Sequence, residues 1–439
     1  MQNSLTKQLY GGIMKMKKEM DIMLLEFSCS NYKSIMNKVT FSFLASKDDT
    51  YEDELKSFSN FKVLRSAVIY GPNGSGKSNF LNAIEFMQGL ILNSINYQPG
   101  DDISQYAHKL SGDETPSIFS MQFIKNDIRY AYGFSLRNRS VDEEYLYYFP
   151  KNRQVKIFER KGISIKPGDK YKSAFELSYE VLKENRLFLS CAANFSKIKE
   201  IEQAFLFFKE DIVVYNPEVN NWTEYSMKLI QKNEKIKEIF INILNSLGTG
   251  IRDIDTKFEK RNIRVTDLSK EMPDTLKSLL FGETNQLSVK LIYDHFETDL
   301  VSEESRGVKK LFEVICPIID ILKNGKILIC DEIETSLHES IVWEIVSLFK
   351  KAQTNKFAQL LFTTHDTSLL DSKLFRRDQI WFTELDDSRS TDLYSLAEIK
   401  NVRKTENLRN GYMLGKYRAM PIMSQNIYSL FNDDKKEGV

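Results

Sequence analysis

Short alternations of apolar and polar residues dominate the first third of the chain. Residues 23–45 predict two strands with a turn near Asn31, because Val39, Phe41 and Phe43 alternate with polar residues at the period of a half-buried strand. The alternation resumes with many Tyr and Phe residues, which favour sheet, in the segments 117–136, 144–149 and 155–158. The pattern therefore predicts a mixed, largely antiparallel sheet built from 23–45 and 117–160, with a polar loop over 95–116.

The pattern becomes helical from about residue 172 to 250. Apolar residues follow one helical face and end before Gly248, a suitable C-cap, at Ile236, Ile239, Phe240, Ile243, Leu244 and Leu247. The charged residues of 232–238 are then the solvated face, although a nucleic-acid role for them is an alternative. Strands are expected to return at 251–265 and 286–293.

Beyond Lys326 the chain alternates strand and helix. The expected elements are a strand at 326–330, a helix at 338–352 and a strand at 358–363. This order is typical of βαβ units and predicts a parallel sheet within 326–385.

These patterns divide the chain into five parts. We expect a poorly ordered extension (1–22), the N-terminal half of an α/β head with a β lobe (23–171), a mainly helical insertion (172–285), the C-terminal half of the head (286–430) and a flexible charged tail (431–439). Met23 is as good a start of the ordered fold as Met1.

Composition narrows the class of protein without naming it. The 439 residues have a formal net charge of zero, so no basic field marks the whole molecule as a nucleic-acid binder, although a local basic groove remains possible. No apolar run approaches the length of a membrane span, and no signal peptide is indicated. The cysteines form no C-x-x-C pair and indicate reduced, buried thiols in a cytosolic protein: Cys29, Cys191, Cys316 and Cys330.

The sequence Gly-Pro-Asn-Gly-Ser-Gly-Lys-Ser at 71–78 matches the Walker A phosphate loop. A short apolar strand at 66–70 enters the loop and a helix at 79–87 leaves it, so the helix N-terminus faces the phosphates. Lys77 would contact the β- and γ-phosphates, and the Ser78 hydroxyl would bind Mg²⁺. The residues expected to bind ATP here are Gly71, Asn73, Gly74, Ser75, Gly76, Lys77, Ser78 and Asn79.

A second apolar strand ends in two acids, Asp331 and Glu332. At the carboxyl edge of a parallel sheet the first acid can hold Mg²⁺, and the second can orient or deprotonate the attacking water. Such a strand is a weak motif alone, but together with a Walker A loop it indicates Walker B. His365, which ends the strand after it, is then a catalytic switch histidine rather than a structural residue.

Between these motifs, Ser305 and Gly307 open a helix that is expected to run to Leu322 with a kink near Pro317. A Ser and a Gly at a helix N-terminus can bind an anion, and the simpler alternative is an N-cap. Their position 26 residues before Asp331 favours an ABC-type signature motif.

The order Walker A, signature, Walker B and switch histidine resembles ABC-type ATPase heads. Walker A and signature lie more than 200 residues apart, and the signature departs from L-S-G-G-Q, so the chain does not resemble a transporter cassette. Instead it resembles the OLD-like (overcoming lysogenization defect) AAA ATPases of bacterial phage defence, whose head is shared with SMC-type ATPases. The resemblance rests on the motifs at 31–35, 71–78, 304–311, 331–338, 363–366 and 411–421.

The resemblance adds one site residue and has several departures. It makes Lys33 a nucleotide contact from the N-terminal turn. Val308 stands where relatives usually have Thr, and His338 stands where transporter-like heads place an Asp. Gln105 and Gln122 are both open as the Q-loop residue. The acidic residues expected of a Toprim nuclease domain are not apparent, because Glu384, Asp386 and Asp387 are better interpreted as a surface turn.

The resemblance implies an ATP- and Mg²⁺-dependent ATPase that acts as a sensor or regulator in anti-phage abortive infection. The signature of one subunit would complete the ATP site of another in a homodimer or higher oligomer. A separately encoded toxic effector, most simply a nuclease, would be the partner. The expectation of ATP rather than GTP rests on the family resemblance alone. A RecF-like repair or recombination ATPase acting directly on DNA is the alternative, and a structural hub with vestigial hydrolysis is a third reading.

Overall fold

The computed structural model describes residues 21–216, 221–263, 282–351, 356–371, 373–403 and 406–419. Residues 1–20 of the predicted extension (1–22) and the predicted tail (431–439) lie outside these ranges. Among the described helices, none is both long enough and apolar enough to cross a bilayer. The five domain boundaries expected from the sequence remain predictions.

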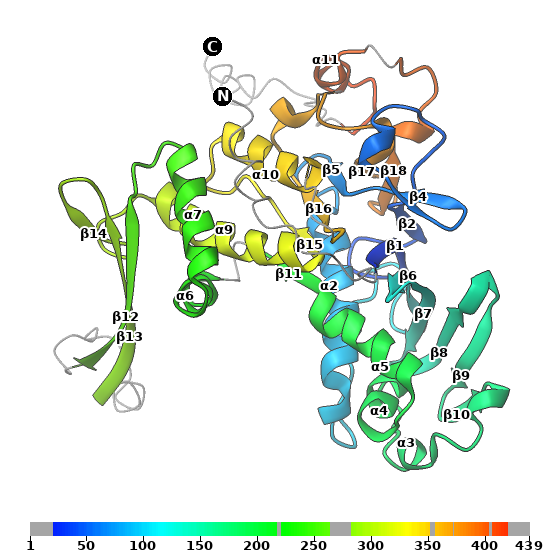
Figure 1. Cartoon of the computed structure of the whole chain (residues 1–439). Coiled ribbons are helices and arrows are strands. Elements are labelled where there is room, and N and C mark those ends of the chain that lie inside the picture. The colour runs from blue at the N-terminus through cyan, green and yellow to red at the C-terminus, as the bar shows by residue number, and fades with distance from the viewer. Residues whose placement is uncertain are drawn as a thin grey trace, which may run out of the picture.

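One lobe is an antiparallel sheet, with the strand order β10-β9-β8-β7-β6-β1-β2. Its strands are β1 (Ile22–Ser30), β2 (Val39–Ser42), β6 (Ser117–Lys125), β7 (Ile128–Arg137), β8 (Ser140–Phe149), β9 (Val155–Lys161) and β10 (Ser164–Pro167). The two halves of the predicted lobe join directly, because β1 pairs with β6 from Ile22–Lys125 to Ser30–Ile118. The predicted strands and turn are therefore confirmed (Figure 1).

The other lobe contains a mixed, mainly parallel sheet with the order β11-β15-β16-β5-β17-β18. Its strands are β5 (Ser66–Tyr70), β11 (Ile212–Tyr215), β15 (Ile327–Cys330), β16 (Gln359–Thr363), β17 (Ile380–Leu385) and β18 (Thr391–Ser395). The predicted parallel sheet is confirmed, and β5 from the N-terminal half lies between β16 and β17. Strands far apart in sequence thus meet at one carboxyl edge.

One strand, β11, corrects the sequence prediction. It lies within the stretch expected to be helical, yet pairs in parallel with β15 from Ile212–Ile327 to Tyr215–Cys330. Four residues are too few to show a period, and the surrounding helices dominate the pattern. The parallel sheet therefore takes its edge strand from the middle of the chain.

Helices pack against both sheets (Figure 1). They are α2 (Lys77–Asn93), α3 (Glu176–Glu180), α4 (Phe188–Phe195), α5 (Lys199–Leu206), α6 (Thr223–Lys232), α7 (Glu234–Ser246), α9 (Arg306–Asn324), α10 (Glu339–Lys351) and α11 (Leu408–Met413), with a π-helical turn at Phe207–Asp211. Pro317 lies inside α9 without ending it. Gly248 follows α7 with a φ of 79°, the left-handed conformation expected beyond a C-cap.

A hairpin of β12 (Asp253–Ile263) and β13 (Gly282–Ile292) projects beside α6 and α7, and the short β14 (Glu297–Asp299) pairs with β13 (Figure 1). It matches the strands predicted at 251–265 and 286–293. The stretch 172–285 therefore contains strands as well as helices. Two further short strands, β3 (Lys56–Phe58) and β4 (Phe61–Val63), form a separate hairpin.

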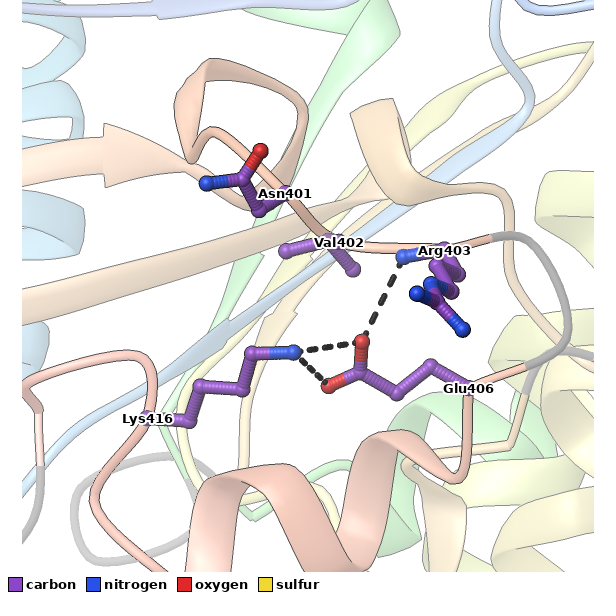
Figure 2. A pocket seen from close by; sticks show the side chains of 5 residues that line it. All are labelled: Asn401, Val402, Arg403, Glu406 and Lys416. Atoms are coloured by element: carbon purple, nitrogen blue, oxygen red, sulfur yellow. Dashed lines mark hydrogen bonds and ion pairs between the residues drawn. The ribbon is translucent and has the colours of Figure 1, made fainter.

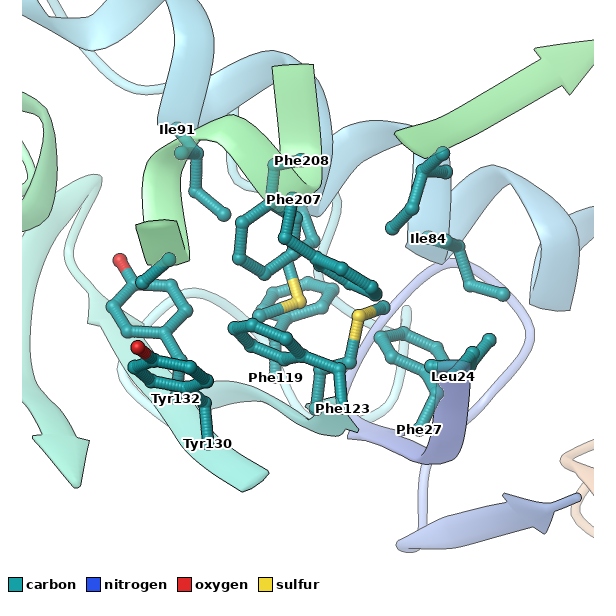
Figure 3. Packing of buried hydrophobic residues seen from close by; sticks show 14 of the residues in the cluster. Leu24, Phe27, Ile84, Ile91, Phe119, Phe123, Tyr130, Tyr132, Phe207 and Phe208 are labelled. Atoms are coloured by element: carbon teal, nitrogen blue, oxygen red, sulfur yellow. The ribbon is translucent and has the colours of Figure 1, made fainter. Parts of the chain in front are cut away.

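Alternation along β5 divides the core into two clusters on opposite faces of the parallel sheet. Ala67 and Ile69 belong to the cluster under the antiparallel lobe and α2, whereas Val68 and Tyr70 belong to the cluster under α9 and α10. In the first cluster, Phe123 stacks on Phe207 with ring centroids 3.9 Å apart (Figure 3). All four cysteines are buried and unpaired, as predicted.

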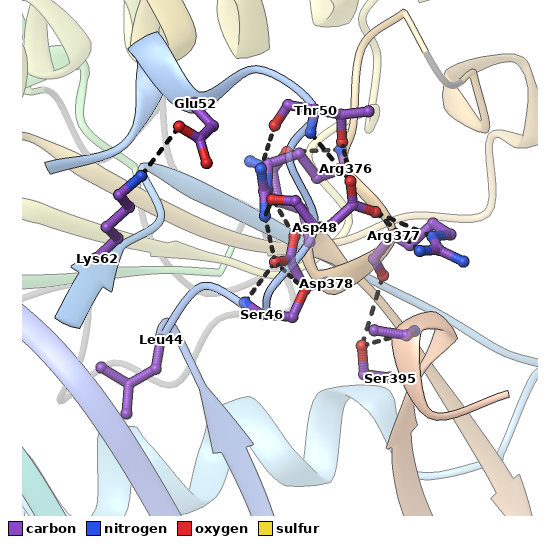
Figure 4. A network of polar contacts seen from close by, with 12 residues as sticks. Leu44, Ser46, Asp48, Thr50, Glu52, Lys62, Arg376, Arg377, Asp378 and Ser395 are labelled. Atoms are coloured by element: carbon purple, nitrogen blue, oxygen red, sulfur yellow. Dashed lines mark hydrogen bonds and ion pairs between the residues drawn. The ribbon is translucent and has the colours of Figure 1, made fainter. Parts of the chain in front are cut away.

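A polar clamp joins the segment after β2 to the segment before β17 (Figure 4). Asp378 accepts hydrogen bonds from Ser46 N–H and from the Arg376 guanidinium, both at 2.8 Å. The guanidinium of Arg377 lies 3.0 Å from Asp48. Arg376 is 1% exposed, so its charge is fully compensated inside the protein. The clamp fixes the loop after β2 against the start of β17, which borders the Walker A strand.

Candidate nucleotide site

The Walker A loop joins the all-buried strand β5 to α2. The first intrahelical bond of α2 runs from Phe80 N–H to Gly76 O at 2.9 Å, so the amides of Lys77, Ser78 and Asn79 lie at the free end of the helix. Such amides and the helix dipole favour an anion. This geometry matches the predicted phosphate cradle.

Two glycines of the loop are required by close packing and backbone conformation. A Cβ atom on Gly71 would lie 2.4 Å from Thr383 Oγ1. Gly76 has a φ of 103°, and a Cβ there would lie 2.0 Å from Thr391 Oγ1. Either substitution would force the loop away from the β17–β18 hairpin.

That hairpin supports the loop through hydroxyl groups that the sequence motifs did not reveal. Ser75 Oγ lies 2.6 Å from Thr383 Oγ1, and Thr391 donates to the Ser75 carbonyl at 2.9 Å. Thr391 also contacts Ser34 Oγ at 2.7 Å, and Asn79 donates to Ser34 at 2.8 Å. A threonine in a strand is a weak sequence signal, so only the packing identifies these contacts.

Lys77 lies inside the cradle. Its Nζ donates to the carbonyls of Gly71 at 2.9 Å and Pro72 at 3.2 Å, and the residue is 5% exposed. Burial lowers the pKa of Lys77, and the carboxylates of Glu332, Asp331 and Glu334 act in the opposite direction. The Walker A lysine and the Walker B acids therefore share one electrostatic environment.

The Walker B acids lie where β15 ends, beside the end of β16. Thr363 Oγ1 donates to Asp331 Oδ1 at 2.5 Å and accepts the amide of Glu332 at 2.8 Å. Glu332 adopts a φ of 44°, which turns the chain sharply after the strand. Buried Thr363 thereby binds the carboxylate of Asp331 and the backbone of Glu332, although no sequence motif singled it out.

His365 and two carboxylates form the next layer of the site. His365 Nε2 lies 3.7 Å from Glu332 Oε1, and its amide donates to Glu334 Oε1 at 2.6 Å. The other carboxylate oxygen, Glu334 Oε2, is buried and has no hydrogen-bond partner among the described residues. The structure thus places His365 beside Glu332, and its role as a switch histidine stays a prediction.

ATP and Mg²⁺ fit these residues. The amides at the start of α2 and Lys77 would hold the phosphates, and Ser78 and Asp331 would hold the metal. When bound, Mg²⁺ would neutralise part of the phosphate charge. Glu332 can orient a water molecule or accept a proton from it. The unpaired oxygen of Glu334 can accept a further hydrogen bond.

The signature residues begin α9. Ser305 is exposed and its Oγ accepts the Val308 amide at 3.3 Å, so the N-cap alternative is present in the structure. A Cβ on Gly307 would lie 3.7 Å from Ser336 O in the loop after Walker B. The N-cap does not exclude a role in binding the partner's ATP, which stays a prediction.

Lys33 lies on the turn next to Ser34, which contacts the loop and α2. It has a φ of 48°, and its Nζ lies 5.6 Å from the Tyr32 ring and 5.8 Å from the Tyr106 ring. Burial lowers the pKa of Lys33, and Glu85 opposes that shift. Its nucleotide contact remains a prediction.

Two further residues considered in the sequence, Gln105 and Asp386, make defined hydrogen bonds in the structure. Gln105 donates to the Leu136 carbonyl and accepts the Arg139 amide, so it joins the loop to β7. Asp386 accepts amides of its own hairpin turn from Ser388 and Ser390, which matches the predicted acidic turn. Among the described residues, no group of three or more His, Cys, Asp or Glu side chains could hold a metal ion.

A hollow of about 710 Å³ lies away from these motifs, near α11. Figure 2 shows Lys416 pairing with Glu406, which also accepts the Arg403 amide at 3.3 Å. None of the predicted site residues lines it.

The fold and the site define an α/β P-loop ATPase with an antiparallel β lobe. The family model described as "AAA domain, putative AbiEii toxin, Type IV TA system" matches residues 66–371, and the chain belongs to this family. No curated protein matches the sequence. The finer OLD-like assignment remains a prediction.

The fold is also similar to SMC head structures. An SMC head bound to the C-terminal winged-helix domain of ScpA has a TM-score of 0.43 and 14% identity over 85% of this chain and 97% of that one. For the SMC head from Thermotoga maritima the TM-score is 0.38 and the identity is 13%, over 85% of this chain and 98% of that one. A third structure is an SMC head with an extended coiled coil, bound to the C-terminal domain of ScpA derived from Pyrococcus furiosus. Its TM-score is 0.41 and its identity is 15%, over 90% of this chain and 100% of that one.

Proposed function

We propose that this protein binds and hydrolyses ATP with Mg²⁺ as the regulatory subunit of a bacterial anti-phage, abortive-infection system. The observation that carries the ATPase proposal is the meeting of Lys77, Asp331 and Glu332 at one sheet edge, with Thr363 joining the two acids. The family description, which names AbiEii and a type IV toxin–antitoxin system, supports the biological setting.

In this proposal the ATP state controls a separately encoded toxic effector, with a nuclease as the expected class. Two subunits would enclose two ATP molecules, and each Ser305–Gly307 pair would contact the γ-phosphate bound by the partner's Lys77. Closure and opening of that dimer would hold or release the effector. The family description names a toxin, so the rival reading is that the chain is itself the toxic component.

Nucleotide binding is tested by isothermal titration of ATP into the parent and Lys77→Ala. The variant should lose binding because the loop amides alone cannot offset the polyphosphate charge. Lys416→Ala, in the hollow near α11, is the matched control and should bind as the parent does. Equal ATP affinity in the parent and Lys77→Ala would contradict the proposed site.

The regulatory role is tested by a nuclease assay of the isolated chain with ATP, Mg²⁺ and Mn²⁺. We expect no cleavage of DNA or RNA without a second protein. Cleavage that disappears in Asp386→Ala and Asp387→Ala would instead make the chain a self-contained nuclease. Tight DNA binding that weakens steeply with salt would favour the RecF-like alternative.

A further inference from the structure

A buried cation lies in α9 just over one turn beyond Ser305. Lys310 is 8% exposed, and its Nζ lies 3.5 Å from Glu313 Oε2 on the same helix. Nζ also donates a hydrogen bond to the Tyr215 hydroxyl and lies 4.9 Å from the centre of that ring. The three side chains form a closed polar cluster between α9 and the end of β11.

Tyr215 belongs to this cluster and to the nucleotide site at the same time. Its hydroxyl donates to Glu313 Oε1 at 2.6 Å. Its carbonyl accepts the amide of Asp331 at 3.0 Å, at the point where β15 ends. One residue therefore holds the signature helix by its side chain and the Walker B residue by its backbone.

The surroundings keep the cluster in one arrangement. Burial, followed by the hydrogen bond to Glu313, raises the pKa of Tyr215, so its hydroxyl keeps its proton and remains a donor. The Trp222 ring packs 4.2 Å from the Tyr215 ring. Ser226 Oγ donates to the Glu313 carbonyl at 3.1 Å, which fixes this turn of α9 from the other side.

We propose that Tyr215 is a positioning residue that couples the N-terminal turn of α9 to Asp331, so that docking of the signature on a second ATP site adjusts the Walker B acids of the same chain. This inference rests on the proposed ATP-bound dimer. A shift of α9 would either separate the Tyr215 hydroxyl from Glu313 and Lys310 or move Tyr215 together with the helix. Separation would leave Lys310 buried without its partners, which is costly, so movement of Tyr215 is favoured. That movement displaces the Tyr215 carbonyl, which accepts the Asp331 amide.

The test compares two Tyr→Phe variants that each remove one hydroxyl bound to α9. Tyr215→Phe breaks the coupling, whereas Tyr225→Phe removes a bond to Asp320 at 3.0 Å, seven residues and about 10 Å further along the helix. In ATPase assays we expect Tyr215→Phe to lower kcat about five-fold with KM for ATP nearly unchanged. Tyr225→Phe should keep both values near those of the parent.

A readout independent of hydrolysis separates this inference from the proposed function. Amide hydrogen exchange should increase together at residues 306–310 and 331–336 in Tyr215→Phe, and at neither segment in Tyr225→Phe. If the parent does not hydrolyse ATP, the proposed function fails, while the exchange experiment still decides the coupling. Faster exchange in α9 alone, or equal changes in both variants, would overturn it.

A double-mutant cycle completes the test. Lys310→Met removes the charge from the same cluster and retains most of the side-chain volume. If Lys310 and Tyr215 act as one unit, the double variant should be no less active than the less active of the two single variants. Fully multiplicative losses would show independent structural effects and contradict the coupling.

Discussion

Thr363 Oγ1 lies 2.5 Å from Asp331 Oδ1, and the same oxygen accepts the amide of Glu332 at 2.8 Å. One hydroxyl thus binds the carboxylate of Asp331, to which it donates, and the backbone of Glu332, from whose amide it accepts. The Thr363 side chain comes from a neighbouring strand, so the orientation of the acids depends on the register of β15 and β16.

This relationship makes Thr363→Val a sharp test. The substitution keeps the shape and removes both hydrogen bonds, so we expect ATP hydrolysis to fall about ten-fold or more while ATP binding persists. Thr364→Val is the control, since it removes a hydroxyl that accepts the Asp366 amide at 3.0 Å instead. Equal ATPase losses in both variants would indicate general damage to the strand.

Glu332→Gln should retain ATP binding and lose turnover. The amide preserves the shape but cannot accept a proton, and it weakens the interaction with His365. Single-turnover hydrolysis and ATP titration would separate the two steps. A rate within a few-fold of the parent would move the catalytic role to Glu334, whose buried oxygen is the next available base.

The proposed shared site predicts complementation between two inactive chains. Lys77→Ala and Ser305→Arg homodimers should not hydrolyse ATP, whereas their mixture should regain about one working site per heterodimer. Ser302→Arg, an exposed change in the same loop, should remain active alone and shows whether added charge is harmful there. A mixture that stays inactive although both chains fold would rule out the trans arrangement.

The clamp of Figure 4 predicts a specific acid sensitivity. Burial alone would raise the pKa of Asp48, but hydrogen bonds from Thr50 and Arg377 outweigh it and lower the pKa from 3.8 to about 2. The folded state therefore binds fewer protons than the unfolded state between these values. The stabilisation is present above the unfolded pKa and is lost as pH falls through the folded pKa.

Asp48→Asn should consequently destabilise the protein at neutral pH and flatten the dependence of stability on pH between about 4 and 2. Urea unfolding at several pH values measures both effects. An unchanged acid slope in Asp48→Asn would mean that the ion pair with Arg377 does not contribute to stability.

The sequence by itself predicts the nucleotide site, because a phosphate-binding loop depends on local spacing. A phosphate loop needs its glycines, Lys77 and Ser78 at fixed positions between a strand and a helix, and the structure has β5 and α2 at those places. The antiparallel lobe could also be predicted, since apolar and polar residues alternate along strands that have one face toward solvent. The strand β15, which ends at Cys330 just before Asp331, was predicted instead from a short continuous apolar run, and all four of its residues are buried.

Only the tertiary structure decided which distant groups support that chemistry. Tyr215 belongs to a strand too short to show a period, and Thr363, Thr383 and Thr391 are ordinary strand residues whose roles arise from register and packing. Thr383 and Thr391 bond to Ser75 across more than 300 residues of sequence, and Tyr215 bonds to Glu313 across 98. Local patterns cannot encode such partners, because burial and sheet order are set by the whole core at once.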